Sequence, residues 1–124
     1  MSLTKEETIM GKELKANIRT QEEGLAIIDL KGEVTSFSDE AINSLVDEAV
    51  QKNVQKIVFN FTDVSYINSS GIAILIGIVT SPANKELTFR VYGLTPHFKK
   101  IFRMIGLTQY VKVLGSEEEA LVAA

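Results

Sequence analysis

The sequence has 124 residues, of which 45% are hydrophobic and 23% charged, and its formal net charge is −3. This length and composition predict one globular domain, and the acidic balance argues against a protein that binds nucleic acid over its whole surface. Because it has no cysteine and a single histidine, His97, the chain lacks disulfides, thiol chemistry and the usual zinc ligand sets.

The N-terminal third of the chain begins with a polar stretch and continues with two strand-like segments. Residues 1–12 lack sustained periodicity, so we predict a flexible arm there and a domain over residues 13–124. Apolar residues alternate with polar ones over residues 14–18, and a more apolar run follows at residues 25–30. With a turn at residues 22–24, these runs predict an antiparallel hairpin at the edge of a sheet.

Helix and strand signals alternate over the rest of the chain. Either Ser36 or Ser38 fits the N-cap of a first helix, and Ser36 with Asp39 resembles a capping box. The apolar stripe of that helix consists of residues 41, 42, 45, 46, 49 and 50. The later elements are predicted as a strand over 56–61, a helix over 69–81, a strand over 87–92, a helix from Pro96 to Gly106, a strand over 111–114 and a helix after Ser116.

The element order is therefore ββαβαβαβα, which predicts a single α/β domain. Strands that alternate with helices form parallel pairs through right-handed crossovers. We expect a mixed, mostly parallel sheet with an antiparallel N-terminal edge hairpin and with helices mainly on one face. No apolar run has the length of a membrane span, and no signal-peptide core is present, so we predict a cytoplasmic protein without a membrane partner.

The most informative segment links the strand at residues 56–61 to the helix at residues 69–81. Asn68, Ser69 and Ser70 lie where that helix begins, and the first N–H groups of a helix have no internal partner. In one interpretation Asn68 or Ser69 is simply the N-cap, which stabilises a helix by about 0.5–2 kcal/mol. In the other, one serine accepts a phosphate, which the helix dipole favours and which adds almost two negative charges.

The helix that follows these serines is uncharged from Ser69 to Asn84. A stripe at residues 72, 75, 76 and 79 is predicted to face the sheet. Ile74 and Ile78 lie on another side, so two arrangements remain open. Either they form an exposed apolar patch that contacts a partner, or neighbouring helices cover them.

Several segments, in register with the predicted elements, resemble the STAS domain, the module of anti-sigma factor antagonists and of the cytoplasmic tails of sulphate transporters. The resemblance covers the chain from about Leu14 onwards. The matching segments are Leu30-Lys31-Gly32-Glu33-Val34, residues 57–67, Asn68-Ser69-Ser70-Gly71-Ile72, Leu94-Thr95-Pro96, Phe102 and Gly106-Leu107.

The resemblance implies a switch centred on Ser69. In that family the first serine of the signature is phosphorylated by an anti-sigma factor that is also a serine kinase. The unphosphorylated antagonist binds this kinase and relieves inhibition of the sigma factor, and a phosphatase restores it. For this chain we predict Ser69 as the phosphoacceptor, with no catalysis, metal or cofactor. The predicted partner-binding residues are Glu33, Thr35, Asn68, Ser70, Gly71, Ile74 and Ile78.

Two positions depart from the family pattern. Bacterial antagonists usually carry Asp where this chain has Asn68, and commonly Asp where it has Thr35. These replacements predict a more neutral site. They keep open the alternatives of a constitutive antagonist and of a non-phosphorylated scaffold in a stress-sensing complex. Separately, a weak homo-oligomer is also kept open.

Two further alternatives come from other residues. A small hydrolase would use Ser69 or Ser70 as nucleophile, His97 as base and Asp63 to orient it, but the G-x-S-x-G pattern is absent. An anion- or nucleotide-binding module is suggested by the charge distribution, although the phosphate-binding glycine motif is absent as well. Residues 29–63 hold seven acidic and three basic side chains, whereas residues 85–103 hold one acidic residue and the basic Lys85, Arg90, Lys99, Lys100 and Arg103.

Overall fold

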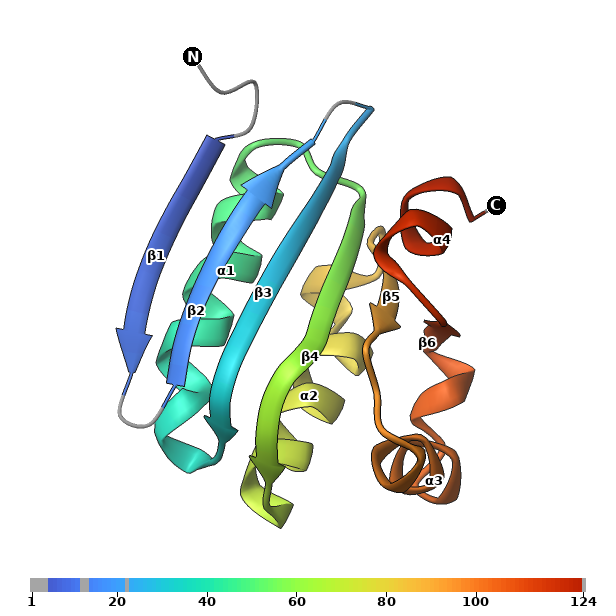
Figure 1. Ribbon diagram of the computed structural model, residues 1–124. Helices are drawn as coiled ribbons and strands as arrows, with labels where there is room; N and C mark the ends of the chain where they lie inside the picture. The colour runs from blue at the N-terminus through green and yellow to red at the C-terminus, as the bar shows by residue number, and fades with distance from the viewer. Residues whose placement is uncertain (1–4, 12–13, 22, 124) are drawn as a thin grey trace.

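The computed structural model describes residues 5–11, 14–21 and 23–123, which form one sheet covered by helices (Figure 1). The sheet has six strands, and their order in space is their order in the sequence. The first three strands pair antiparallel and the later ones parallel. The strands are β1 (Lys5–Gly11), β2 (Leu14–Thr20), β3 (Leu25–Val34), β4 (Lys56–Ile67), β5 (Thr88–Tyr92) and β6 (Val111–Leu114).

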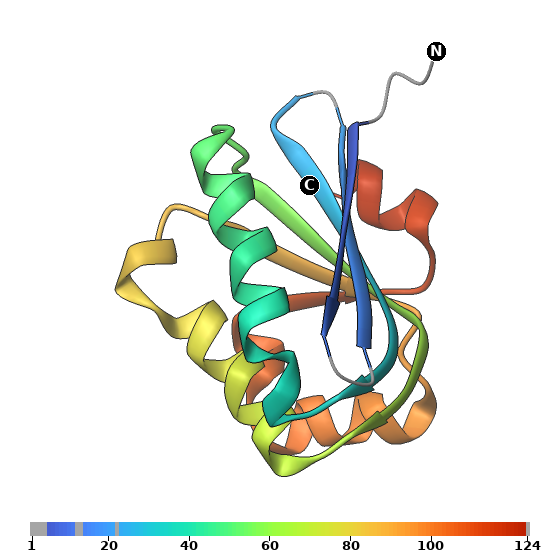
Figure 2. The ribbon, with the colours of Figure 1, turned by 90° about the vertical axis from the view of Figure 1, so that its left-hand side faces the viewer.

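Three of the four helices lie on one face of the sheet, as predicted. Because each parallel strand adds on the same side of its predecessor, right-handed crossovers place the connecting helices on a common face. The helix after the last strand is not bound by this rule and lies on the other face (Figure 2). The helices are α1 (Asp39–Gln51), α2 (Ser69–Thr80), α3 (Pro96–Met104) and α4 (Glu117–Val122), with 3₁₀ turns η1 (Ser36–Ser38), η2 (Pro82–Asn84) and η3 (Leu107–Gln109).

The structure corrects the prediction for the N-terminal arm. Residues 5–11 form β1, which pairs with β2, so β1 and not the predicted hairpin is the edge of the sheet. The two apolar residues of this segment, Ile9 and Met10, are adjacent, so the period-two pattern of a strand is not visible in the sequence. Residues 1–4 and 12 of the predicted arm lie outside the described part of the chain.

The hydrophobic core has two parts, one on each face of the sheet. The larger part lies between the sheet and α1, α2 and α3, and α1 contributes its predicted stripe except for the exposed Val50. The smaller part lies beneath α4 and consists of Leu25, Ile27, Val58, Tyr92 and Ala120. The larger core anchors α2, the helix that carries the predicted phosphoacceptor.

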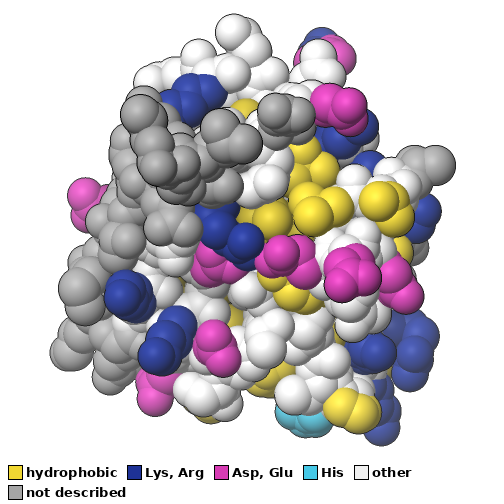
Figure 3. Space-filling view, turned by 45° about the horizontal axis from the view of Figure 1, so that its top comes forward, with side chains coloured by type: hydrophobic (Ala, Val, Ile, Leu, Met, Phe, Trp, Pro, Cys, Tyr) yellow, Lys and Arg dark blue, Asp and Glu magenta, His cyan; other side chains and the backbone are white. Residues whose placement is uncertain are grey.

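A polar network attaches α4 to the smaller face. The Arg19 guanidinium donates to Asp29 at 2.6 Å and to Glu117 at 2.6 Å, and the Tyr92 hydroxyl donates to Glu117 at 2.8 Å. The bond from Arg19 lowers the pKa of Glu117, while burial raises the pKa of Tyr92. Acidic side chains form a row in the view of Figure 3. The first turn of α4 holds three glutamates.

Candidate functional site

The carboxyl ends of β3 and β4 bring together the two positions that depart from the family pattern. The parallel register places Val34 beside Ile67, and the Asn68 N–H donates to the Val34 carbonyl at 3.3 Å. Thr35 directly follows Val34. The two positions at which this chain lacks the usual aspartates are therefore neighbours at one end of the sheet, which is where α/β proteins commonly build their sites.

The start of α2 is capped by Asn68. Its side-chain oxygen accepts a hydrogen bond from the Gly71 N–H at 2.9 Å, with an extended backbone at Asn68. Ser69 and Ser70 occupy the first two helical positions and are exposed. Among the residues that the structure describes, neither hydroxyl has a hydrogen-bond partner. Capping is thus assigned to Asn68, and the Ser69 hydroxyl faces solvent beside the N–H groups of the first turn.

Gly71 holds the start of α2 close to the end of β3. A Cβ atom at this position would lie 2.1 Å from the Val34 carbonyl oxygen and 2.7 Å from its carbon. No side chain can occupy that space without moving one of the two elements. The absence of a side chain at Gly71 therefore determines how close Ser69 lies to the end of the sheet.

Thr35 belongs to the turn that leads into α1. Its hydroxyl accepts from the Phe37 N–H at 3.2 Å, and its own N–H donates to the Ser38 hydroxyl at 2.9 Å. This capping box lies one residue earlier than the predicted one at Ser36, because β3 continues to the residue before Thr35. With 6% exposure, Thr35 shapes the turn and offers little of its side chain to the predicted partner surface.

Two exposed aromatic residues, which the sequence analysis missed, lie at the same end of the sheet. Phe37 in η1 is 55% exposed and Tyr66 near the end of β4 is 50% exposed, while the half-buried Glu33 is opposite Tyr66 in the register. η1 also contacts α2. Strand β4 continues past its predicted end at residue 61, and this extension carries Tyr66. We refer to Phe37, Tyr66, Ser69 and Ser70 as the serine surface.

The buried face of α2 differs from the prediction. Leu75 of the predicted stripe is buried and Val79 packs against the core, but Gly71 and Ile78, which lie outside the predicted stripe, are buried as well, so the buried face is rotated around the helix. Of the two arrangements left open for Ile78, the structure shows the covered one, since its exposure is 3%, and this predicted partner-binding residue therefore lies in the core. Ile74 is half-buried against the core, whereas Ile76, predicted to face the sheet, is 37% exposed. The close approach of Gly71 to β3 explains this rotation.

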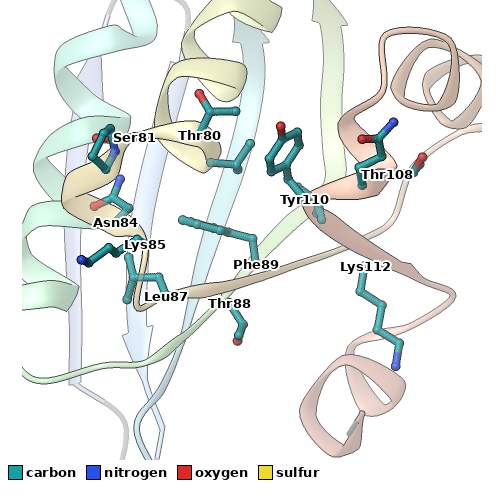
Figure 4. Close-up of a pocket in the computed structure, with 14 residues that line it drawn as sticks. Thr80, Ser81, Asn84, Lys85, Leu87, Thr88, Phe89, Thr108, Tyr110 and Lys112 are labelled. Carbon is teal, nitrogen blue, oxygen red and sulfur yellow. The ribbon is translucent and has the colours of Figure 1, made fainter.

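Two surface hollows flank α2. A hollow of about 350 Å³ between α1 and α2 is lined by Asp39, Asn43, Ala73, Ile74, Gly77 and Ile78. A larger hollow of about 640 Å³ lies at the C-terminal end of α2, which is the end opposite Ser69. In Figure 4, Lys85 and Lys112 at this hollow point away from each other. Because the 12 residues of α2 span about 18 Å, the larger hollow is remote from Ser69.

The residues of the hydrolase alternative do not form a catalytic arrangement. Asp63 on β4 pairs in register with Lys31 on β3, and the His97 ring at the start of α3 lies 5.9 Å from the Phe98 ring. Within the described ranges, no hydrogen bond connects His97 to Asp63 or to Ser69. The geometry therefore provides no activated nucleophile at this serine.

The basic residues of the anion-binding alternative are also dispersed. Arg90 is buried and donates to the carbonyls of Ala120 and Ala123, both at 2.6 Å. Lys99, Lys100 and Arg103 are exposed on α3, and Lys85 lines the larger hollow. In the described part of the chain no group of three or more His, Asp or Glu residues could hold a metal ion. None of the helices described is long and apolar enough to cross a membrane.

Comparisons with known proteins identify the family and the fold. The family model of the STAS domain matches residues 16–120. An anti-sigma F factor antagonist of Paenibacillus polymyxa is 24% identical over 99 residues, which are 79% of this chain and 85% of the relative. The crystal structure of an anti-sigma factor antagonist from Mycobacterium paratuberculosis has a TM-score of 0.71 at 18% identity, covering 96% of this chain and 93% of the other. The phosphorylated form of SpoIIAA, a Bacillus cell fate determinant, has a TM-score of 0.66 at 24% identity, covering 86% and 96%.

Proposed function

Because the chain belongs to the STAS domain family, we propose that it is an anti-sigma factor antagonist that binds its partner through the serine surface and is switched by phosphorylation of Ser69. One observation carries this proposal. The Ser69 hydroxyl is exposed at the start of α2 and does not serve as the helix cap, and it lies at the same end of the sheet as two exposed aromatic rings. The Paenibacillus relative, named an anti-sigma F factor antagonist, and the phosphorylated form of SpoIIAA support it.

The unphosphorylated serine surface suits a protein partner. Exposed aromatic side chains such as Phe37 and Tyr66 provide a large contact area, and aromatic residues are enriched at the centres of interfaces. The first turn of α2 contains no acidic residue, and α2 is uncharged along its length. A partner that covers this surface leaves Ser69 in a contact from which water is excluded.

Phosphorylation of Ser69 acts differently on the free and on the bound protein. In the free protein, the N–H groups and dipole of α2 stabilise the phosphate, and the neutral Asn68 cap places no carboxylate beside it. In the complex, almost two negative charges enter a dehydrated contact. The phosphate therefore weakens partner binding more than it disturbs the fold.

In this proposal the protein has a regulatory and not a catalytic role, and it acts in the cytoplasm. Its partner is an anti-sigma factor with serine kinase activity, which transfers the phosphate to the Ser69 hydroxyl. A phosphatase then removes the phosphate and restores binding. The carboxylates usually found at positions 35 and 68 are absent, so the kinase recognises the serine without them.

Replacement of Ser69 by Asp and by Asn separates the effect of charge from that of size. Both residues fit the first turn of a helix, and Asp there is stabilised by the dipole, so the fold is retained. We expect Ser69→Asp to bind the cognate anti-sigma factor at least about tenfold more weakly than Ser69→Asn, which corresponds to about 1.4 kcal/mol in calorimetric titrations. Equal affinities would refute the switch at Ser69 and favour a constitutive antagonist or scaffold.

A further inference from the structure

The end of α3 presents an unusually exposed hydrophobic side chain. Met104, the last residue of α3, is 73% exposed, and the next residue, Ile105, is exposed as well. Arg103 directly precedes Met104, and Lys100 lies one helical turn before it. Within the part of the chain that the structure describes, neither cation forms a salt bridge. The end of α3 is therefore an apolar projection with a basic margin.

The hollow between α1 and α2 has the complementary character. Its floor includes Ala73, Ile74 and Gly77, and a Cβ atom at Gly77 would meet nothing within 4 Å. Asp39 lies at its margin, and Asp47, two turns further along α1, is exposed on the same side of that helix. The hollow is thus a depression of about 350 Å³ that is apolar on the α2 side and polar on the α1 side, where Asn43 donates to the Asp39 carboxylate.

We propose that this protein associates with a second copy of itself, with Met104 of one copy inserted into the hollow between α1 and α2 of the other. Flexible Met side chains adapt well to irregular apolar spaces. Lys100 and Arg103 around Met104 then face Asp39 and Asp47 around the hollow. We therefore favour a second copy of the chain over an acidic membrane as the partner of α3. The chain offers both a hollow for Met104 and acidic side chains for the two cations, whereas a membrane has no such hollow.

The contact is heterologous, because projection and hollow are different surfaces of one chain. Figure 2 shows α3 along the bottom of the molecule, whereas α1 and α2 face to the left. Each copy therefore binds one neighbour with α3 and another with α1 and α2, which produces an open series or a ring. The contact area is small and its margins are charged, so association is reversible and weakens as salt increases.

Charge reversal on the two surfaces tests this contact in the purified chain, without an anti-sigma factor, so the result is independent of the function proposed above. One variant carries Lys100→Glu with Arg103→Glu, and the other carries Asp39→Lys with Asp47→Lys. All four positions are exposed, and circular dichroism checks that the fold is retained. In sedimentation at low salt, we expect the wild-type chain to self-associate and each variant alone to be monomeric.

An equimolar mixture of the two variants provides the decisive measurement, because it restores opposite charges at every contact. We expect the mixture to associate with an affinity within about threefold of the wild type, whereas Met104→Ser in the wild-type background lowers it at least about tenfold. A monomeric wild type, or a mixture that stays monomeric, would overturn the proposal. So would association of the wild-type chain that the charge-reversed variants retain.

Discussion

At the scale of single residues, the position of Ser69 depends on a neighbour without a side chain. Gly71 lets the first turn of α2 approach the Val34 carbonyl, and Asn68 closes the same turn by accepting from the Gly71 N–H. These two contacts hold the serine at the end of the sheet without using its hydroxyl. Because its neighbours make these contacts, the Ser69 hydroxyl remains available for the phosphorylation proposed above.

The two glycines of α2 should respond in opposite ways to replacement by alanine. Gly71→Ala forces a Cβ against the Val34 backbone, and such overpacking typically costs about 1–3 kcal/mol. Gly77→Ala meets open space and removes the entropic penalty of glycine in a helix, so it should stabilise the protein by roughly 0.5–1 kcal/mol. Urea unfolding measures both, and equal effects of the two changes would contradict the close approach at Gly71.

The sequence predicted this local arrangement only in part. Asn68 was one of two candidate caps, because both an amide and a hydroxyl can accept from a helix N–H. The close contact between Gly71 and Val34 joins residues far apart in the chain, and no local pattern indicates it. The same reason explains why Thr35 was assigned to a partner surface, although its neighbours in the turn bury it.

At the scale of elements, the limits of α2 were predictable but its orientation was not. Asn68 caps the first turn and Pro82 prevents the helix from continuing, so both ends can be predicted from local sequence. The helix ends within one residue of its predicted limit. A helix that is apolar on all sides has no polar face to indicate which side meets the core. The predicted stripe was therefore wrong at Ile76, and the sequence could not decide between the exposed and the covered arrangement of Ile78.

Lysine substitutions at two isoleucines of α2 should distinguish its buried side from its exposed side. Ile78→Lys places an ammonium group in the core, so we expect a loss of more than about 3 kcal/mol or failure to fold. Ile76→Lys leaves the charge in solvent and should change stability by less than about 0.5 kcal/mol. Thermal unfolding of both variants is the measurement, and similar melting temperatures would show that the rotation of α2 described above is incorrect.

At the scale of the whole molecule, one layer of helices is supported by a large apolar core and the other by a polar network. α1, α2 and α3 share the larger core, whereas α4 shares a core of only five buried residues with the other face of the sheet and depends on Arg19, Tyr92 and Glu117. The contribution of apolar burial to stability changes little with pH, whereas that of a carboxylate network depends on pH. The two faces of the sheet should therefore respond differently to acid.

Acid should weaken the attachment of α4. The hydrogen bond from Arg19 holds the pKa of Glu117 below its usual 4.5 in the folded protein. A group with a lowered folded pKa stabilises the fold above its unfolded pKa, and this contribution is lost as the pH falls through the folded value. We expect Glu117→Gln to lower the free energy of unfolding at neutral pH and to have a much smaller effect at about pH 3. An effect of equal size at both pH values would exclude this role of the carboxylate.

The sequential order of the sheet has a consequence for biosynthesis. Every strand pairs with the strand made immediately before it, so a chain leaving the ribosome can add each strand to an open edge. No strand has to insert between two that are already paired. The elements that hold Ser69 are complete once α2 has emerged, before α3, β6 and α4 are synthesised. The nascent chain can therefore assemble the serine surface while its C-terminal third is still being translated.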